Sequence, residues 1–266
     1  MIGTITSEAN SIVKLAKKLR DKRGRDKEDA FLVEGDNLIE EAFKSGARVT
    51  HLILREGADG DAVAARKQSD IETVVLSDGL FRAIADTVTP RDVMAIVRKP
   101  AEGRRFGPDE LAEGSCSLVV LDRIRDPGNV GSILRSAAAA DFTGVVAVRG
   151  TADIFSPKVV RAASGAVFRL PVYFASDEAS TLEALRARDI RSFACDMTGD
   201  RVYHEATLTG NVAIIVGNEG EGLSAPFRAG ADERVYIPMK EGSESLNASV
   251  AASIVMFEKR KQEAIC

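Results

Sequence analysis

The 266-residue chain has no tryptophan, only two histidines and only three cysteines. Cys116, Cys195 and Cys266 lie far apart, so they form neither a metal-ligand spacing nor a disulfide framework. The two histidines, His51 and His204, argue against a histidine-rich metal site and against a histidine-based catalytic triad. No apolar run reaches the ~18 residues of a membrane span, and the first residues lack the apolar core of a signal peptide. We therefore expect a protein of the reducing cytoplasm that holds no metal ion.

The formal net charge of -4 does not by itself indicate a nucleic-acid-binding protein. A local cluster does, because residues 14–27 hold eight basic side chains against two acidic ones. Such a density can neutralise backbone phosphates. A solvated helix face explains a charge run equally well. The side chains of this cluster that we expect on RNA are Lys14, Lys17, Lys18 and Arg20.

The first half of the chain has the pattern of a small α/β unit. Apolar spacing predicts a helix over 7–20, and the segment FLVEGDNLIEEAFKSG predicts a strand over 31–33, a glycine turn and a helix ending near Gly46. Further strands are expected at 51–54, 73–76 and 93–97, with a helix around 61–68. Residues 99–114 contain two prolines, three glycines and many charges, which predicts a linker.

The second half alternates strands and helices to its end. The predicted strands cover 117–121, 144–148, 170–173, 192–196, 212–216 and 234–237, and the predicted helices cover 130–140, 157–164, 181–187 and 246–261. Fully apolar strands such as VAIIV are typical of a sheet buried on both faces. The sequence therefore predicts an α/β fold with a mostly parallel sheet. The expected domains are residues 1–98 and 115–266, joined by the linker 99–114.

Two polar loops follow predicted strands of this second half. In the first, Asn129 falls at or near the N-cap of a helix, and Arg135 falls on that helix's second turn. The second loop begins at Gly217 and has the sequence GNEGEG. The carboxyl ends of parallel strands share one edge, where open α/β folds bind ligands. Taken singly, these features have simpler explanations: a helix cap, a surface ion-pair donor and a tight turn.

A third loop lies within VYIPMKEGSESLNASVAASIVMF, residues 235–257. Pro238 has no N–H for a sheet ladder, so the strand must end there. Ser243 or Ser245 is expected to cap the next helix, which we place from Leu246 onward. That helix carries small side chains, which let another backbone approach closely; they are Ala248, Ser249, Ala251, Ala252 and Ser253.

In order along the chain, the three loops carry N-x-G-x-x-x-R, then VGNEGEGL, then IPM followed by SLNASV. This set resembles the three motifs of the SpoU, or TrmH-like, RNA 2′-O-ribose methyltransferases, and the resemblance runs from about Ser117 to the end of the chain. In the first half, NSIVK and FLVEGDNLIEEA are similar to the L30e-like substrate-binding domain that precedes the catalytic domain in many members. The resemblance thus implies an N-terminal RNA-binding domain and a C-terminal methyltransferase domain.

The same resemblance implies a deep trefoil knot in the second domain, although chains generally avoid knots. It also implies S-adenosylmethionine as cofactor, held by Gly217, Ile237 and Leu246 with Met239 nearby. The small residues after Leu246 would give a threaded backbone the clearance it needs. The resemblance also implies a homodimer whose site is built at the subunit interface.

For the reaction, the resemblance places Arg135 at the ribose 2′-OH and Asn129 beside it. Glu219, Ser245 and Asn247 are expected to organise the catalytic loop and the target nucleotide. A guanidinium is a poor general base, so we expect Arg135 to bind and orient.

Ribosomal RNA of the 23S type is the expected substrate, because the simplest tRNA-modifying relatives lack the extra domain. A tRNA 2′-O-methyltransferase and a non-catalytic RNA-binding relative in ribosome assembly are the alternatives. A dehydrogenase is excluded, because no GxGxxG opens a helix after the first strand.

Overall fold

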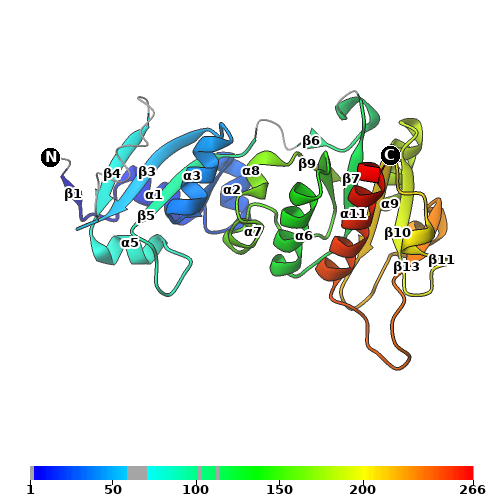
Figure 1. Cartoon of the computed structure of the whole chain (residues 1–266). Coiled ribbons are helices and arrows are strands. Elements are labelled where there is room, and N and C mark those ends of the chain that lie inside the picture. Colours follow the sequence, from blue (N-terminus) through cyan, green and yellow to red (C-terminus); the bar gives the residue numbers. More distant parts are fainter. Residues whose placement is uncertain (1–2, 59–70, 101–103, 112–113, 266) are drawn as a thin grey trace. The chain divides into compact units, whose positions relative to one another are not determined.

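The computed structural model describes residues 3–58, 71–100, 104–111 and 114–265 (Figure 1). The chain divides into two compact units. The first comprises Met1–Glu102 and Phe155–Phe168, and the second comprises Gly103–Ile154 and Arg169–Cys266. Within the described ranges, no helix combines the length and the apolarity that crossing a membrane requires. The helix expected around 61–68 lies outside the described residues.

The first unit is built on a mixed sheet of five described strands in the order β1-β4-β3-β5-β2. Strand β4 pairs in parallel with β1 and β3, whereas β5 pairs antiparallel with β3 and β2. The strands are β1 (Thr4–Ile5), β2 (Ala30–Glu34), β3 (Val49–Arg55), β4 (Glu72–Leu76) and β5 (Val93–Arg98). The helices are α1 (Ser11–Lys18), α2 (Lys22–Glu28), α3 (Asp36–Lys44), α5 (Asp78–Ile84), α7 (Pro157–Ala163) and α8 (Ala166–Arg169).

The basic cluster forms two short helices, α1 and α2, rather than one long one. The Asn10 side chain caps α1 by accepting from the Ile12 N–H at 2.9 Å. The guanidinium of Arg25 is buried and donates to the carbonyls of Leu19 and Arg20, both at 2.8 Å. These bonds satisfy carbonyls at the end of α1 and fix the turn into α2.

Residues 155–168 belong to the first unit, although the sequence places them within the second predicted domain. The rings of Phe155 and Phe168 lie against Phe31 of β2, with centroid distances of 5.1 and 6.1 Å. Arg161 of α7 pairs with Asp86 at 2.7 Å. The expected domain 115–266 is thus interrupted, because Phe155 and Phe168 pack against Phe31 of the first sheet.

The second unit contains an eight-stranded sheet of described strands in the order β11-β13-β10-β12-β7-β8-β9-β6. Every pairing in it is parallel. The strands are β6 (Arg104–Arg105), β7 (Ser117–Asp122), β8 (Gly144–Val148), β9 (Val172–Ala175), β10 (Arg191–Cys195), β11 (Arg201–Val202), β12 (Val212–Gly217) and β13 (Glu233–Tyr236). The helices are α6 (Pro127–Ala139), α9 (Glu178–Ala187), α10 (Ala225–Gly230) and α11 (Ala248–Ile265), with short 3₁₀ turns η1 (Pro108–Glu110) and η2 (Tyr203–Glu205). The prediction of a mostly parallel α/β sheet is confirmed.

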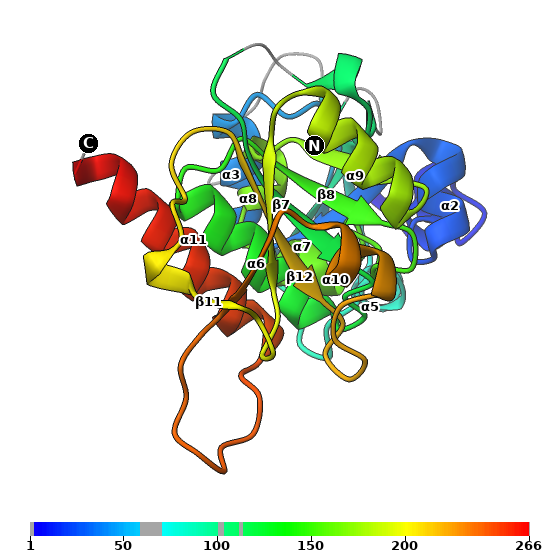
Figure 2. The same ribbon diagram turned by 90° about the vertical axis from the view of Figure 1, so that its right-hand side faces the viewer.

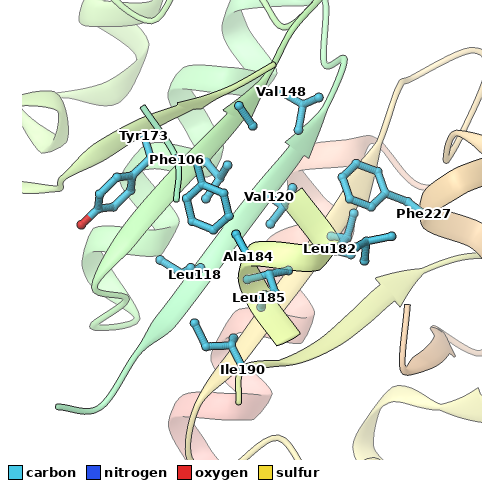
Figure 3. Close-up of a cluster of buried hydrophobic side chains, with 14 of the residues drawn as sticks. Phe106, Leu118, Val120, Val148, Tyr173, Leu182, Ala184, Leu185, Ile190 and Phe227 are labelled. Atoms are coloured by element: carbon cyan, nitrogen blue, oxygen red, sulfur yellow. The ribbon is translucent and has the colours of Figure 1, made fainter. Parts of the chain in front are cut away.

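Helices cover both faces of this sheet. Figure 2 shows α6 and α11 on one side of β7 and β12, and α9 and α10 on the other. Figure 3 shows Leu182 and Leu185 of α9 against Leu118 and Val120 of β7. Burial on both faces explains why β12 is apolar throughout and why β7 carries polar residues only at its two ends, Ser117 and Asp122.

Three expectations for the second unit need correction. Strand β9 begins at Val172, two residues after the predicted start, because Pro171 lacks the N–H that a central strand must donate. The expected linker is not wholly irregular, since β6 within it pairs in parallel with β9. Helix α10, which begins with Pro226 in its first turn, was not predicted.

Candidate functional site

The carboxyl ends of β7, β10, β12 and β13 meet at one edge of the parallel sheet. Loops after three of these strands, together with the start of α11, line a cavity of about 540 Å³. That volume is within the ~300–1,000 Å³ of ordinary small-molecule sites. Figure 2 shows residues 237–247 as a long loop that joins β13 to α11.

All four residues that the sequence analysis places on a cofactor line this cavity: Gly217, Ile237, Met239 and Leu246. Three of the predicted catalytic residues line it as well, namely Glu219, Ser245 and Asn247. Asn129 and Arg135 are not among its lining residues.

The GNEGEG loop is a closed turn as well as a cavity wall. Asn218 and Gly222 exchange two backbone hydrogen bonds of 3.0 and 2.9 Å. The Asn218 side-chain oxygen accepts from the N–H groups of Gly220 and Glu221, both at 3.0 Å. A Cβ on Gly217 would lie 2.4 Å from the Gly222 carbonyl carbon and from the Leu223 nitrogen. Glycine is therefore required at 217 by the close approach of two backbone segments.

A chain of three polar side chains joins the three predicted loops. Asn247 Nδ2 donates to Asn129 Oδ1 at 2.8 Å, and Asn129 Nδ2 donates to Glu219 Oε1 at 2.9 Å. Glu219 also accepts from the backbone N–H groups of Arg125 and Asp126, both at 3.2 Å. The structure thus brings together residues from motifs that are about 30 to 120 positions apart.

Glu219 is held as a carboxylate. Its partial burial raises its pKa, but the hydrogen bonds from Asn129 and from the backbone of Arg125 and Asp126 outweigh that effect. The net result is a Glu219 pKa below its ordinary value of 4.5. Because a carboxylate can only accept hydrogen bonds, the NH₂ group of Asn129, and not its oxygen, must face Glu219.

The prediction that Asn129 caps its helix is wrong by three positions. Asp126 is the N-cap of α6, with Pro127 in the first turn, and its side chain accepts from the Asn129 N–H at 2.8 Å. A proline at the first helical position is favourable because its missing N–H needs no partner there. Arg135 consequently lies on the third turn of α6 rather than the second. It is exposed, and its side chain has no polar partner in the described part of the chain.

The predicted cap of the last helix also needs correction. Neither Ser243 nor Ser245 caps it, because α11 begins only at Ala248. The Asn247 side-chain oxygen accepts instead from the N–H groups of Ser249 and Val250, at 2.9 and 3.3 Å. Asn247 therefore uses its oxygen as a cap and its NH₂ to hold Asn129.

One wall of the cavity is not marked by any of the three motifs; it is formed by residues just after β10 and by α10. Asp196 accepts from the N–H and hydroxyl of Thr198, both at 2.9 Å, and pairs with Arg228 at 2.9 Å. Cys195, in the same wall, is desolvated, which raises the pKa of its thiol to about 12. The predicted strand over 192–196 includes Asp196. In the structure β10 ends at Cys195, so Asp196 belongs to the loop that lines the cavity.

The basic cluster of the first unit is partly neutralised. Lys17 pairs with Glu8 at 2.8 Å and Lys18 with Glu28 at 3.4 Å. Arg20 donates to the Ala83 carbonyl at 3.0 Å. Among the residues that the structure describes, no group of histidine, cysteine, aspartate and glutamate could hold a metal ion.

The chain matches known proteins over both units. The SpoU rRNA Methylase family matches residues 117–257, and the MRM3-like substrate binding domain matches residues 10–95. A 23S rRNA (guanosine(2553)-2′-O)-methyltransferase, RlmP of Bacillus subtilis (strain 168), is 34% identical over 256 residues, covering 96% of this chain and 98% of the relative.

Solved structures agree with these matches. An AdoMet-bound rRNA methyltransferase from Sinorhizobium meliloti has a TM-score of 0.85 and 29% identity, covering 98% of each chain. The SpoU methyltransferase AviRb from Streptomyces viridochromogenes, in complex with AdoMet, has a TM-score of 0.84 and 27% identity, covering 97% of this chain and 100% of that one. The resemblance drawn from the three motifs is confirmed, and the chain belongs to the SpoU rRNA methylase family.

Proposed function

We propose that this protein is an S-adenosylmethionine-dependent RNA 2′-O-ribose methyltransferase that acts on ribosomal RNA of the 23S type. The observation that carries the proposal is the hydrogen-bonded chain Asn247–Asn129–Glu219 beside the 540 Å³ cavity. The relatives named above as rRNA methyltransferases support the choice of substrate.

The cavity fits the cofactor in size and in its walls. Gly217 leaves backbone rather than side chain at the cavity surface, and Ile237, Met239 and Leu246 add apolar surface for an adenine and a thioether. When bound there, S-adenosylmethionine supplies an electrophilic methyl group on a sulfonium. These four residues would hold it.

The chain's own polar residues then position the acceptor. Asn129 is buried and fixed at both ends of its amide, by Glu219 and by Asn247, so it cannot rotate away. Ser245 lies on the same cavity loop, where it can meet the target nucleotide. Orientation of reacting groups can lower a barrier by up to ~7–11 kcal/mol in ideal cases. A guanidinium stays protonated in proteins, so Arg135 would bind the ribose–phosphate rather than remove its proton.

The site needs a second copy of the chain to receive Arg135. Arg135 is exposed on α6 and does not line the cavity of its own chain. Helix α11, which contacts α6, exposes Val250 and Phe257 to 46% and 48%. An isologous homodimer through α6 and α11 would cover these apolar side chains and carry each Arg135 toward the partner's cavity.

We also propose that the second domain contains the family's trefoil knot. The GNEGEG loop and the loop 237–247 line one cavity, and α11 after them packs on α6 and on the central strand β12. The small residues Ala251 and Ala252 on α11, and the Ser253 hydroxyl that donates to Ser136 at 2.8 Å, allow that close packing.

The first domain would bind the RNA substrate in the cytoplasm. The match to a substrate-binding domain over residues 10–95 and the basic cluster with Lys14, Lys17, Lys18 and Arg20 support this role. We also propose that this domain has the L30e-like fold and that its N-terminal stretch ends near residue 98, before the linker 99–114, with residues 155–168 added to it from the later sequence.

The decisive experiment measures methyl transfer from labelled S-adenosylmethionine to total RNA. We expect incorporation into large ribosomal RNA, at a linkage that becomes resistant to alkaline hydrolysis because its 2′-OH is methylated. Incorporation into tRNA alone would instead indicate a tRNA methyltransferase. No incorporation into any RNA, with RNA binding intact, would indicate a non-catalytic relative.

A further inference from the structure

One wall of the cavity carries a positive charge that the family motifs do not explain. Among the described residues that line the cavity, Arg228 is the one basic side chain. It lies on α10, outside the three motif loops. From its surroundings we propose that Arg228, held by Asp196, binds the carboxylate of the methionyl group of S-adenosylmethionine.

Asp196 forms an ion pair with this arginine. Its side chain is only 6% exposed, and its Oδ2 lies 2.9 Å from Arg228 Nε. Both donors of Thr198 hold the other carboxylate oxygen. Burial raises the Asp196 pKa, but these hydrogen bonds and the charges of Arg228 and Arg234 bring it below the ordinary 3.8, so the anchor is charged at neutral pH.

The guanidinium keeps free donors. Arg228 is 49% exposed, and Asp196 is its single polar side-chain contact within the described part of the chain. A guanidinium bound through Nε still presents both terminal NH₂ groups, which match the two oxygens of a carboxylate. Gly222 lies beside Arg228, where even a Cβ would stay 3.7 Å from its NH₂ group, so the approach is open.

The charges of the remaining wall direct the ligand's orientation. Glu219 and Glu221 lie on the GNEGEG loop, and Glu221 is already paired with Arg123 and Arg125, both at 3.1 Å. A sulfonium and an ammonium are favoured near carboxylates, and the ligand's carboxylate is favoured near Arg228. The inference rests on the proposed function, because it concerns the cofactor of that same site.

The test compares two ligands by isothermal titration calorimetry: S-adenosylmethionine and decarboxylated S-adenosylmethionine, which lacks only the carboxylate. Arg228→Gln should weaken binding of the first by roughly 10- to 100-fold and leave binding of the second unchanged. Asp196→Asn should give a smaller loss with the same selectivity, because the amide no longer fixes the guanidinium. The matched control is Arg201→Gln, since Arg201 is 51% exposed, pairs with Glu233 and does not line the cavity.

The outcomes separate this inference from the proposed function. If the unmodified protein bound neither ligand, the proposed function itself would fail. If it bound both, an unchanged affinity in Arg228→Gln would overturn the inference, and so would an equal loss for both ligands. A loss of RNA binding with cofactor affinity intact would assign Arg228 to a phosphate instead. Thermal unfolding of each variant, with Arg228→Lys as a charge-conserving second variant, identifies any loss that comes from misfolding.

Discussion

The side-chain NH₂ of Asn247 donates to the side-chain oxygen of Asn129 across 2.8 Å, although the two residues are 118 positions apart. The same Asn129 side chain donates onward to Glu219. Asn129 is therefore the middle residue of a hydrogen-bonded series of three side chains, in which both bonds fix the orientation of its amide. Changes at this residue should therefore affect two loops at once.

Replacing Asn129 with Asp tests that central position. The new carboxylate would face Glu219 where an NH₂ group donated before, so the two like charges would raise each other's pKa. We expect a loss of about 1–3 kcal/mol in the free energy of unfolding at neutral pH. Urea unfolding measures this loss. Asn211→Asp is the control, because the Asn211 amide does not belong to the hydrogen-bonded series Asn247–Asn129–Glu219. Equal stability of Asn129→Asp and the unmodified protein would contradict the hydrogen-bond chain.

The depressed pKa of Glu219 gives stability a definite pH dependence. The folded protein binds this proton less readily than the unfolded chain, so the contribution is fully present above about pH 4.5 and is lost as the pH falls through the lower folded pKa. Glu219→Gln should remove this contribution. Urea unfolding from about pH 7 to about pH 3 should show the two proteins differing near neutrality and converging in acid. A difference that grows as the pH falls would refute the assignment.

Gly217→Ala should disrupt the closed turn. Its Cβ would lie 2.4 Å from backbone atoms of Gly222 and Leu223, which cannot move aside as a flexible side chain can. We expect a loss of about 1–3 kcal/mol in stability and a marked loss of S-adenosylmethionine affinity. Gly220→Ala is the matched control, because its Cβ would meet only the Asn218 side-chain oxygen, at 3.8 Å. Similar melting temperatures and affinities for both variants would show that the close approach is unimportant.

Mixing two inactive variants tests the proposed dimer. Arg135→Ala should abolish methyl transfer while leaving cofactor affinity nearly intact, since Arg135 does not line its own cavity. After subunit exchange with Gly217→Ala, half of the dimers should be mixed, each with one complete site. About a quarter of the unmodified activity should return. Failure to recover activity, with mixed dimers demonstrated by mass spectrometry, would place Arg135 at the site of its own chain.

The basic cluster should control the salt dependence of RNA binding. Charge reversal at Lys14, Lys17 and Lys18 should weaken binding and reduce the slope of log K against log salt by about 0.7–0.9 for each phosphate that is no longer neutralised. Lys44→Glu is the control, because Lys44 ends α3 and pairs with Glu40. An unchanged slope would mean that the cluster is a solvated surface that does not bind RNA. The ion pairs of Lys17 with Glu8 and of Lys18 with Glu28 already neutralise part of its charge.

Much of the second domain was predictable because strands near the centre of its sheet, such as β8 and β12, are apolar on both faces. Strands such as β12 are marked by composition alone, and the polar residues that follow them mark the loop edge. The start of α6 was misplaced because the Pro-Gly pair at 127–128 is typical of a turn. In this chain Pro127 opens a helix that Asp126 caps.

Within the site, the motif residues could be predicted but the pairing of Asp196 with Arg228 could not. Arg228 lies on α10, and it reaches Asp196 only because β12, β10 and β13 are neighbours in the sheet. A partnership made by tertiary packing leaves no local pattern in either segment. Likewise, nothing in the spacing of 155–168 indicates that Phe155 lies against Phe31.

The placement of residues 155–168 in the first unit changes what a fragment of this protein would be. The backbone passes between the units three times, at 102–103, 154–155 and 168–169, rather than once. Cutting the chain in the linker would therefore leave the N-terminal piece without the two aromatic rings that cover Phe31. A fragment meant to fold as the first unit would therefore have to supply residues 155–168 as well as the N-terminal stretch.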